Sequence, residues 1–193
     1  MENSGLNFDW FIPLSEKDKT LKEVYAELAS FGDNQGSIPL IVQLVENPKF
    51  DIPGFDVFNG ATSLQTHDYI HILLGRGILP KDEAFVIGFT MGSTNRVSSL
   101  EEKLYGLISK YLYPKEFQFS DSDFDVFKDA LRLGFISDCQ PLNTVDYEAL
   151  MPLSLEEARK AIGIESSLIR AYYEIEQRRY PNDRESQRLL QGF

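Results

Sequence analysis

Helix-capping signals recur along this chain, whereas the strict alternation of apolar and polar residues that marks strands is scarce. Ser98 and Ser99 each precede a glutamate by three residues, and Ser154 precedes Glu157 in the same way, which is the capping-box pattern of helix N-termini. Pro80 suits the first position of a helix and is followed by acidic residues in the first turn, where the helix dipole favours them. Together these signals predict an all-α fold.

We expect a single domain over 1–193 with about seven or eight helices, a metal site between two adjacent helices and an apolar groove. Its parts are N-terminal helices within 15–48, a motif-bearing region over 62–92, further helices over 98–180, and a polar, mobile tail over 182–193. Periodicity and end signals predict individual helices over 15–32, 37–47, 62–74, 80–91, 98–113, 120–132, 154–162 and 166–180, with an ordered loop over 50–62. Gly134 is expected to end the helix that begins at Ser120.

The charge balance restricts the partners. Thirty acidic and nineteen basic residues give a net charge of −11, which should repel a phosphate backbone, so we expect no nucleic-acid partner. The longest apolar stretch, 38–45, is far shorter than the ~20 residues that span a bilayer, and the first ten residues resemble neither a signal nor a transit peptide. The single cysteine, Cys139, has no partner for an internal disulfide. These features predict a soluble cytoplasmic protein.

The only two histidines are four residues apart, at His67 and His71. Around a helix, at about 100° per residue, His71 lies about 40° from His67 and Asp68 lies about 100° from it, so the three side chains can share one face. Two imidazoles and a carboxylate on adjacent turns form an N,N,O ligand set for zinc or another divalent ion. The alternative is that both histidines are ordinary solvated or core residues.

Glu83 is the candidate ligand from the next helix. It shares a stripe with Val86, Ile87 and Thr90, so its carboxylate would point inward, where it needs a metal or a charged partner. The turn at 75–77 would let antiparallel helices bring Glu83 near His71. The alternative is a first-turn glutamate that faces solvent and interacts with the helix dipole.

The spacing H-D-x-x-H-(x)11-E from His67 to Glu83 resembles the metal-binding signature of the fourth coenzyme Q biosynthesis protein family. A second series agrees in order: the basic-Gly element at 132–134, the Asp-aromatic-Glu element at 146–148 and the closing run at 155–164. The resemblance covers 67–164, about half of the chain. It implies that the metal ligands are His67, Asp68, His71 and Glu83.

The chain also departs from the family pattern. The family usually carries an arginine-rich run just before the histidines, whereas this chain has Ala-Thr-Ser-Leu-Gln-Thr at 61–66. Gly88 and Gly92 stand where larger side chains are common, and they share one helix face that could admit either a neighbouring helix or a lipid chain. These departures leave the metal ligands in place and affect the substrate that the resemblance implies.

The resemblance implies a metal-dependent protein of ubiquinone or related prenylquinone biosynthesis, with Zn²⁺ as the metal and Mg²⁺ or Fe²⁺ as alternatives. Its partners would be a prenylated quinone precursor or isoprenoid lipid, other quinone-biosynthesis proteins and the inner face of a membrane, touched peripherally; a homodimer stays open. Two roles stay open. One is catalysis, as oxidative removal of the ring carboxyl group, and the other is a non-enzymatic lipid-binding scaffold with a structural metal. The sequence does not separate them, since no residue outside the ligand set is identifiable as an acid, base or nucleophile.

Two other metal classes fit less well. Zincin proteases use the glutamate of H-E-x-x-H as general base, and the aspartate here is one methylene shorter, with no third ligand at the expected distance. Phosphohydrolases with an adjacent His-Asp pair need a further histidine upstream, and this chain has none.

Overall fold

The computed structural model describes residues 10–33, 64–94 and 119–193, and over these residues the chain is helical without a strand. The elements are α1 (Leu21–Asp33), α3 (Leu64–Leu74), α4 (Pro80–Ser93), α6 (Asp121–Ile136), the 3-10 helix η3 (Leu142–Thr144), α7 (Tyr147–Leu150), α8 (Leu155–Ala161), α9 (Ser166–Arg179) and α10 (Arg184–Gln187). This confirms the all-α prediction. The helices predicted over 37–47 and 98–113 and the loop over 50–62 lie outside the described residues. None of the helices found is both long and apolar enough to cross a membrane.

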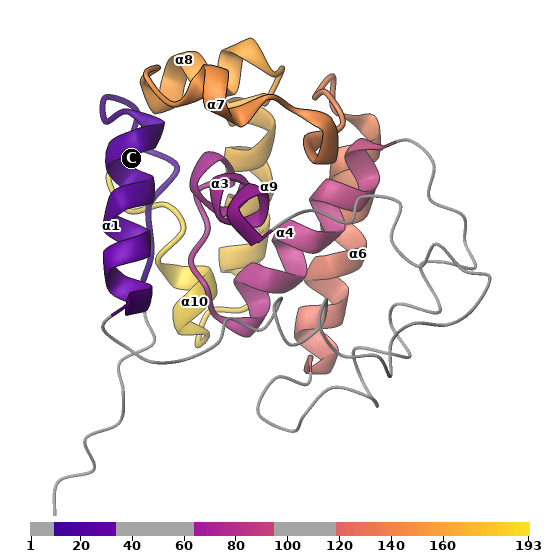
Figure 1. Cartoon of the computed structure of the whole chain (residues 1–193). Coiled ribbons are helices and arrows are strands. Elements are labelled where there is room, and N and C mark those ends of the chain that lie inside the picture. Colours follow the sequence, from indigo (N-terminus) through magenta and orange to yellow (C-terminus); the bar gives the residue numbers. More distant parts are fainter. Residues whose placement is uncertain (1–9, 34–63, 95–118) are drawn as a thin grey trace, which may run out of the picture.

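Helix α3 lies in the middle of the molecule, with α1, α4, α8 and α9 around it (Figure 1). Its residues Ile70, Ile72, Leu73 and Leu74 are each fully buried, although they point in different directions around the helix. A helix that is apolar on nearly every side is stable only when it is covered on every side. Burial of each of these side chains contributes about 1.5–3 kcal/mol of transfer free energy.

The C-terminal end of α3 is closed by side chains from distant helices. Gly75 follows with a φ of 69°, the left-handed conformation that ends a helix. The Tyr173 hydroxyl donates to the Leu74 carbonyl at 2.6 Å, and Arg159 Nε donates to the Leu73 carbonyl at 2.9 Å. Carbonyl groups that have no partner within the helix are therefore bonded by α8 and α9, which fixes these helices against α3.

Helices α4 and α6 pack together so closely that three glycines are required at the contact. A Cβ on Gly88 or Gly92 would collide with the carbonyl oxygens of Phe127 and Leu131, and one on Gly134 would collide with the Phe89 carbonyl. The helix-packing interpretation of Gly88 and Gly92 is therefore correct. The predicted end of α6 at Gly134 is wrong, because this glycine lies inside the helix, where it lets the α4 backbone approach.

Helix α1 begins at Leu21 rather than near Ser15. Thr20 forms the N-terminal cap, since its hydroxyl accepts from the Glu23 backbone N–H at 3.2 Å while Glu23 Oε2 accepts from the Thr20 backbone N–H at 2.8 Å. Ser15 instead donates to the backbone carbonyl of Gln191 at 2.5 Å. The residue that was expected to start a helix therefore fastens the two ends of the described chain together.

The segment 182–193 was predicted to be a polar, mobile tail, and this prediction is wrong. It contains α10, and Ser186 and Leu189 are fully buried. The Ser186 hydroxyl donates to Glu176 Oε1 of α9 at 3.0 Å. This polar-looking stretch is thus ordered by a few buried contacts with α9 and the core.

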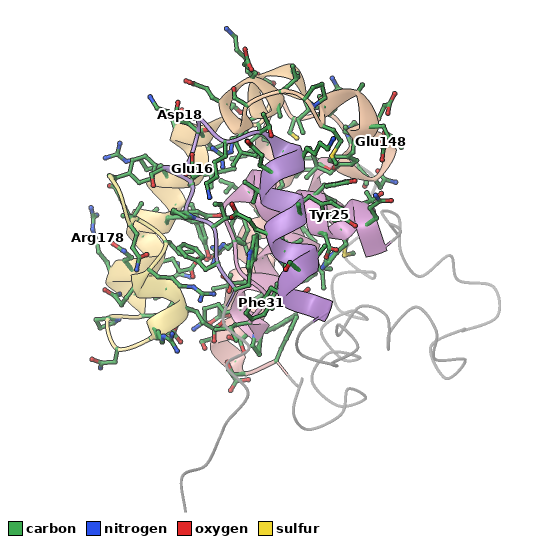
Figure 2. The ribbon with its side chains drawn as sticks, turned by 60° about the vertical axis from the view of Figure 1, so that its left-hand side comes forward. Glu16, Asp18, Tyr25, Phe31, Glu148 and Arg178 are labelled. Atoms are coloured by element: carbon green, nitrogen blue, oxygen red, sulfur yellow. The ribbon has the colours of Figure 1, made fainter. Side chains whose placement is uncertain are left out.

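A cluster of three tyrosine rings connects α3 to two other helices. The Tyr69 ring lies 4.7 Å from that of Tyr25 on α1 and 5.3 Å from that of Tyr147 on α7, measured between ring centroids. Figure 2 shows Tyr25 on the flank of α1 opposite to Glu16 and Asp18. The tyrosine cluster helps to hold α3 in a fixed orientation, because aromatic pairs of this kind add about 0.5–1.5 kcal/mol each.

Candidate metal centre

His67, His71 and Glu83 meet in the interior of the molecule. His67 Nε2 lies 2.8 Å from His71 Nε2 and 2.9 Å from Glu83 Oε2, and His71 Nε2 lies 3.3 Å from Glu83 Oε1. Their ligand atoms form a group within 4.8 Å of one another that could hold a metal ion. The prediction that these three residues come together is therefore confirmed.

The local sequence explains why these side chains converge. His67 and His71 lie one turn apart on α3, and their rings meet edge to face with centroids 4.5 Å apart. In α4, Asp82 takes the capping role, because its Oδ2 accepts from the Leu79 backbone N–H at 3.3 Å. Glu83 is only 7% exposed and points to the histidines. The interpretation of Glu83 as a solvent-facing dipole partner is therefore wrong.

The sequence suggested that α3 and α4 lie antiparallel, and this expectation is wrong. Figure 1 shows α3 nearly end-on and α4 running across the view, so their axes cross. The first turn of α4 still contacts α3, because the turn after Gly75 is short and Gly77 lies tightly against Trp10 and Asp82. Glu83 therefore reaches the histidines from the first turn of a crossing helix.

The backbone of this turn sets the orientation of one histidine. His71 Nδ1 lies 2.6 Å from the Gly77 carbonyl oxygen, so Nδ1–H donates to it. In the neutral ring this leaves the Nε2 lone pair directed at His67 and Glu83. A ligand histidine fixed through its other nitrogen is the usual arrangement in metal sites. Residue types could not have revealed this contact, because Gly77 contributes only its backbone.

The charges in the group are strongly coupled. Burial alone would raise the pKa of Glu83, but the two adjacent imidazoles outweigh it and hold that pKa well below its usual range. Burial alone would lower the pKa of His71, but the Glu83 charge and hydrogen bond raise it above the usual value. The pKa of His67 is lowered, chiefly by burial and further by His71, although Glu83 opposes this. Glu83 is thus ionised beside two imidazole rings, of which His71 is protonated more readily than His67.

The donor set fits a divalent cation. With Nδ1–H of His71 bonded to Gly77, a neutral His71 presents an acceptor at Nε2, and it faces the acceptor oxygen Glu83 Oε1. Two acceptors in contact are favourable only when a proton or a cation lies between them. Ligand atoms of a tetrahedral zinc site stand about 3.3 Å apart, as follows from bonds of about 2.0 Å. Small outward movements of these side chains would produce that spacing.

Asp68 is not part of this group. Its side chain is partly buried, and burial together with the Glu83 charge raises its pKa to about 6, although His71 opposes this. Its carboxylate is therefore close enough for the charges of His71 and Glu83 to shift its pKa. Its role as a fourth ligand stays a prediction.

The residues of the supporting motif have structural roles in the described part of the chain. Asp146 caps α7 by accepting from the Ala149 backbone N–H at 3.4 Å, and Arg159 binds backbone carbonyls. Arg132 lies on the exposed side of α6 beside Asp129. None of the three belongs to the His67–His71–Glu83 group.

No protein-family model matches the chain, and no curated protein or solved structure matches it either.

Proposed function

We propose that the chain binds one divalent metal ion, zinc, through His67, His71 and Glu83, and that it acts in ubiquinone or related prenylquinone biosynthesis. The observation that carries the metal proposal is the convergence of two imidazole nitrogens and a carboxylate within 4.8 Å, in a buried position. Two imidazoles favour zinc or iron over magnesium, which prefers oxygen ligands. The pathway follows from the resemblance of the 67–83 spacing to the fourth coenzyme Q biosynthesis protein family.

Three protein ligands leave a coordination position for a substrate oxygen or water, and Asp68 is the candidate for a further protein ligand. A zinc ion bound here would supply Lewis-acid polarisation of a coordinated oxygen. His67, His71 and Glu83 would bind the ion, and the Gly77 carbonyl would hold His71 in the correct tautomer. The proposed substrate is a prenylated hydroxybenzoate-type precursor, and the reaction that the resemblance implies is oxidative removal of its ring carboxyl group, for which a separate oxidant would be needed because zinc has no redox chemistry.

Prenylated precursors dissolve in bilayers, so the protein would work peripherally at the inner membrane face, together with other quinone-biosynthesis proteins. The net charge of −11 disfavours attraction to anionic lipids, so contact with the bilayer would be apolar.

The second candidate is a non-enzymatic isoprenoid-binding scaffold with a structural metal. One observation favours it: His67, His71 and Glu83 are only 4%, 1% and 7% exposed, and they connect α3 to α4. A metal at this place would stabilise the fold whether or not it takes part in chemistry.

The test is native mass spectrometry with elemental analysis of protein purified without chelator or histidine tag. We expect one zinc ion per chain, and a co-purified prenyl lipid would support the pathway. A matched His67→Ala/His71→Ala variant should lose the metal. Wild-type protein that stays metal-free after incubation with Zn²⁺ would refute the metal proposal.

Replacement of zinc by Co²⁺ separates the two candidates, because its visible spectrum reports the coordination sphere. Addition of a prenylated hydroxybenzoate should change the spectrum if the ring oxygens reach the metal. Binding of this compound without a spectral change would favour the scaffold.

A further inference from the structure

A cavity of about 470 Å³ lies between the segment before α1, α8, the first half of α9 and the C-terminal Phe193. Figure 2 shows the part of the first segment that carries Glu16 and Asp18 beside α9. The residues that line it and carry donor groups include Lys17, Arg159, Ser166, Ser167 and Arg170. His67, His71 and Glu83 do not line this cavity, so it is separate from the candidate metal centre.

Arg159 is only 3% exposed, and its guanidinium forms no ion pair with a carboxylate of the described residues, although Glu16 and Glu156 are near enough to attract it. Its Nε donates to the Leu73 carbonyl at 2.9 Å, and its Nη1 donates to the carbonyls of Leu14 and Glu16 at 3.0 and 2.7 Å. Its Nη2 has no hydrogen-bond partner. Burial lowers the pKa of Arg159 to about 10, which reflects the cost of a charge that is bonded only to neutral groups.

Other buried arginines of this protein are neutralised. Arg76 is fully buried and forms a two-pronged ion pair with Glu176, with N–O distances of 3.1 and 2.5 Å. Arg188, which is 6% exposed, pairs with Asp82. A buried cation without an ion-pair partner is costly. Glu16 and Glu156 attract the Arg159 guanidinium without pairing with it, so an added anion beside Arg159 would relieve part of this cost.

The N-terminus of α9 opens onto the same cavity. Its cap residue, Glu165, makes no side-chain capping bond, and its first turn holds no acidic residue. Ser166 and Ser167, in this turn, both line the cavity. The first backbone N–H groups of a helix have no partner within it, and the helix dipole adds partial positive charge there. Helices α6 and α8, by contrast, are each closed by a capping box.

The remaining charges leave this cavity slightly positive in a strongly acidic protein. Lys17, Arg159 and Arg170 face two lining carboxylates, Glu156 and Glu174. Glu174 lies 3.5 Å from Arg170 and also 3.5 Å from Arg178, so it is shared between two arginines. Lys17 is exposed and can turn its ammonium group toward a ligand.

We propose that this cavity binds the phosphate group of a small organic molecule. The Arg159 guanidinium supplies the buried positive charge, the backbone N–H groups of Ser166 and Ser167 supply oriented donors, and Lys17 adds charge at the mouth. The unpaired helix amides offer donors to the acceptor oxygens of a phosphate, and the buried guanidinium beside them adds positive charge. The volume exceeds that of a phosphate group, and Ala171 and Phe193 offer an apolar surface to the organic part.

The experiment is titration of the full-length, metal-free protein with inorganic phosphate and with glycerol 3-phosphate at constant ionic strength, followed by calorimetry and thermal unfolding. We expect saturable binding at one site, with the ester binding more tightly than the free ion. Because Arg159 also donates hydrogen bonds to three backbone carbonyls, its substitution could disturb the fold, and the test variants leave it unchanged. Lys17→Gln should weaken binding about two- to fivefold, as is typical of an exposed charge, while the matched control Lys160→Gln should leave it unchanged.

Ser166→Asp places a carboxylate of the chain itself at the start of α9. We expect this variant to unfold at a higher temperature than wild type without ligand and to lose phosphate binding, because its own carboxylate competes for the site. The His67→Ala/His71→Ala variant should still bind phosphate, so failure of the metal proposal would not affect this result. The proposal is overturned if phosphate stabilises no more than chloride does, or if Lys17→Gln and Ser166→Asp both bind phosphate like wild type.

Discussion

His71 and Gly77 are joined by a hydrogen bond of 2.6 Å between the imidazole Nδ1 and the backbone carbonyl oxygen. Gly77 belongs to the turn that leads into α4, so one short segment both delivers Glu83 to the site and orients His71. This segment has no room for a side chain, because a Cβ at Gly77 would collide with Arg188 Nη2 and would lie 2.5 Å from the Trp10 carbonyl oxygen. The orientation of His71, a candidate metal ligand, is therefore connected to the packing of the whole turn.

Gly77→Ala is expected to damage stability and metal binding together. Overpacking at a closed position costs about 1–3 kcal/mol, and displacement of the carbonyl would release the His71 ring. Chemical unfolding of the metal-free variant measures the first effect, and zinc titration of its folded fraction measures the second. A variant that unfolds like wild type and binds zinc with wild-type affinity would show that the His71–Gly77 contact has no influence on the site.

Glu83→Gln is the sharpest test of the metal centre. The substitution keeps the size of the side chain but removes its charge, so zinc affinity should fall at least about tenfold and most of the zinc-dependent rise in melting temperature should disappear. His67→Ala and His71→Ala should have the same effect. Melting curves with and without zinc, together with metal analysis, provide the measurement.

The matched control for this change is Glu148→Gln, at an exposed carboxylate of α7. It carries the same loss of charge and should keep full zinc occupancy. If Glu83→Gln also keeps full occupancy and full stabilisation by zinc, Glu83 is not a ligand.

Asp68→Asn separates two roles for the remaining candidate ligand. Asp68 lies outside the group of converging ligand atoms, so we expect this variant to lower zinc affinity less than Glu83→Gln does. Zinc titrations of the two variants under the same conditions make the comparison. An equal loss in both would show that Asp68 moves to coordinate the metal directly.

Local signals predicted the helices that carry the candidate metal centre, and long-range contacts explain where these signals failed. The boundaries of α3 and α4 follow from Gly75 and Pro80, which act on the backbone next to them. Ser15 looked like a helix start, but its hydroxyl bonds the carbonyl of Gln191, 176 residues away. No local pattern contains such a partner.

In the candidate site, too, some features follow from neighbouring residues in the sequence and others only from contacts made in the fold. Helical spacing placed His67 and His71 on one face, and the inward stripe of α4 indicated Glu83. The hydrogen bond from His71 to Gly77 depends on a backbone carbonyl, and the crossing of α3 and α4 depends on packing around the turn. The bonding of Arg159 to backbone carbonyls, with Nη2 left without a hydrogen bond, was also beyond sequence reasoning, because only the fold brings these groups together.

Glu185 should make stability depend on pH. Burial, and secondarily the Asp82 charge, raises its pKa to about 7, although a hydrogen bond from the Lys81 backbone N–H opposes this. Between about pH 4.5 and pH 7, Glu185 is largely deprotonated in the unfolded chain but still protonated in the folded one. The contribution of Glu185 to stability therefore falls as pH rises through this window. Glu185→Gln should therefore raise the melting temperature at pH 8 relative to wild type but not at pH 4.

Thermal unfolding at a series of pH values checks this expectation, with Glu148→Gln again as the exposed control. A Glu185→Gln variant that is destabilised equally at both pH values would indicate that the carboxylate matters for its hydrogen bond rather than for its charge.

The pair formed by Arg76 and Glu176 should be the most sensitive ion pair among the described residues. Both side chains are fully buried, Arg76 also lies 4.0 Å from the centre of the Phe85 ring, and Glu176 holds Ser186 of α10. Glu176→Gln would remove the closer carboxylate from this guanidinium and leave only Asp82, which lies 3.7 Å from Arg76 Nη1 and is shared with Arg188. We therefore expect a loss of about 3–5 kcal/mol in the free energy of unfolding, measured with urea.

The exposed pair of Lys19 and Glu27 provides the comparison, because its 2.7 Å contact joins side chains that are 43% and 49% exposed. Glu27→Gln should cost at most about 1 kcal/mol. The double variant Arg76→Met/Glu176→Leu should recover part of the loss seen in Glu176→Gln, since it removes the stranded charge as well as its partner. If Glu176→Gln and Glu27→Gln lower stability equally, the buried pair is not what fixes α9 and α10 against the turn between α3 and α4.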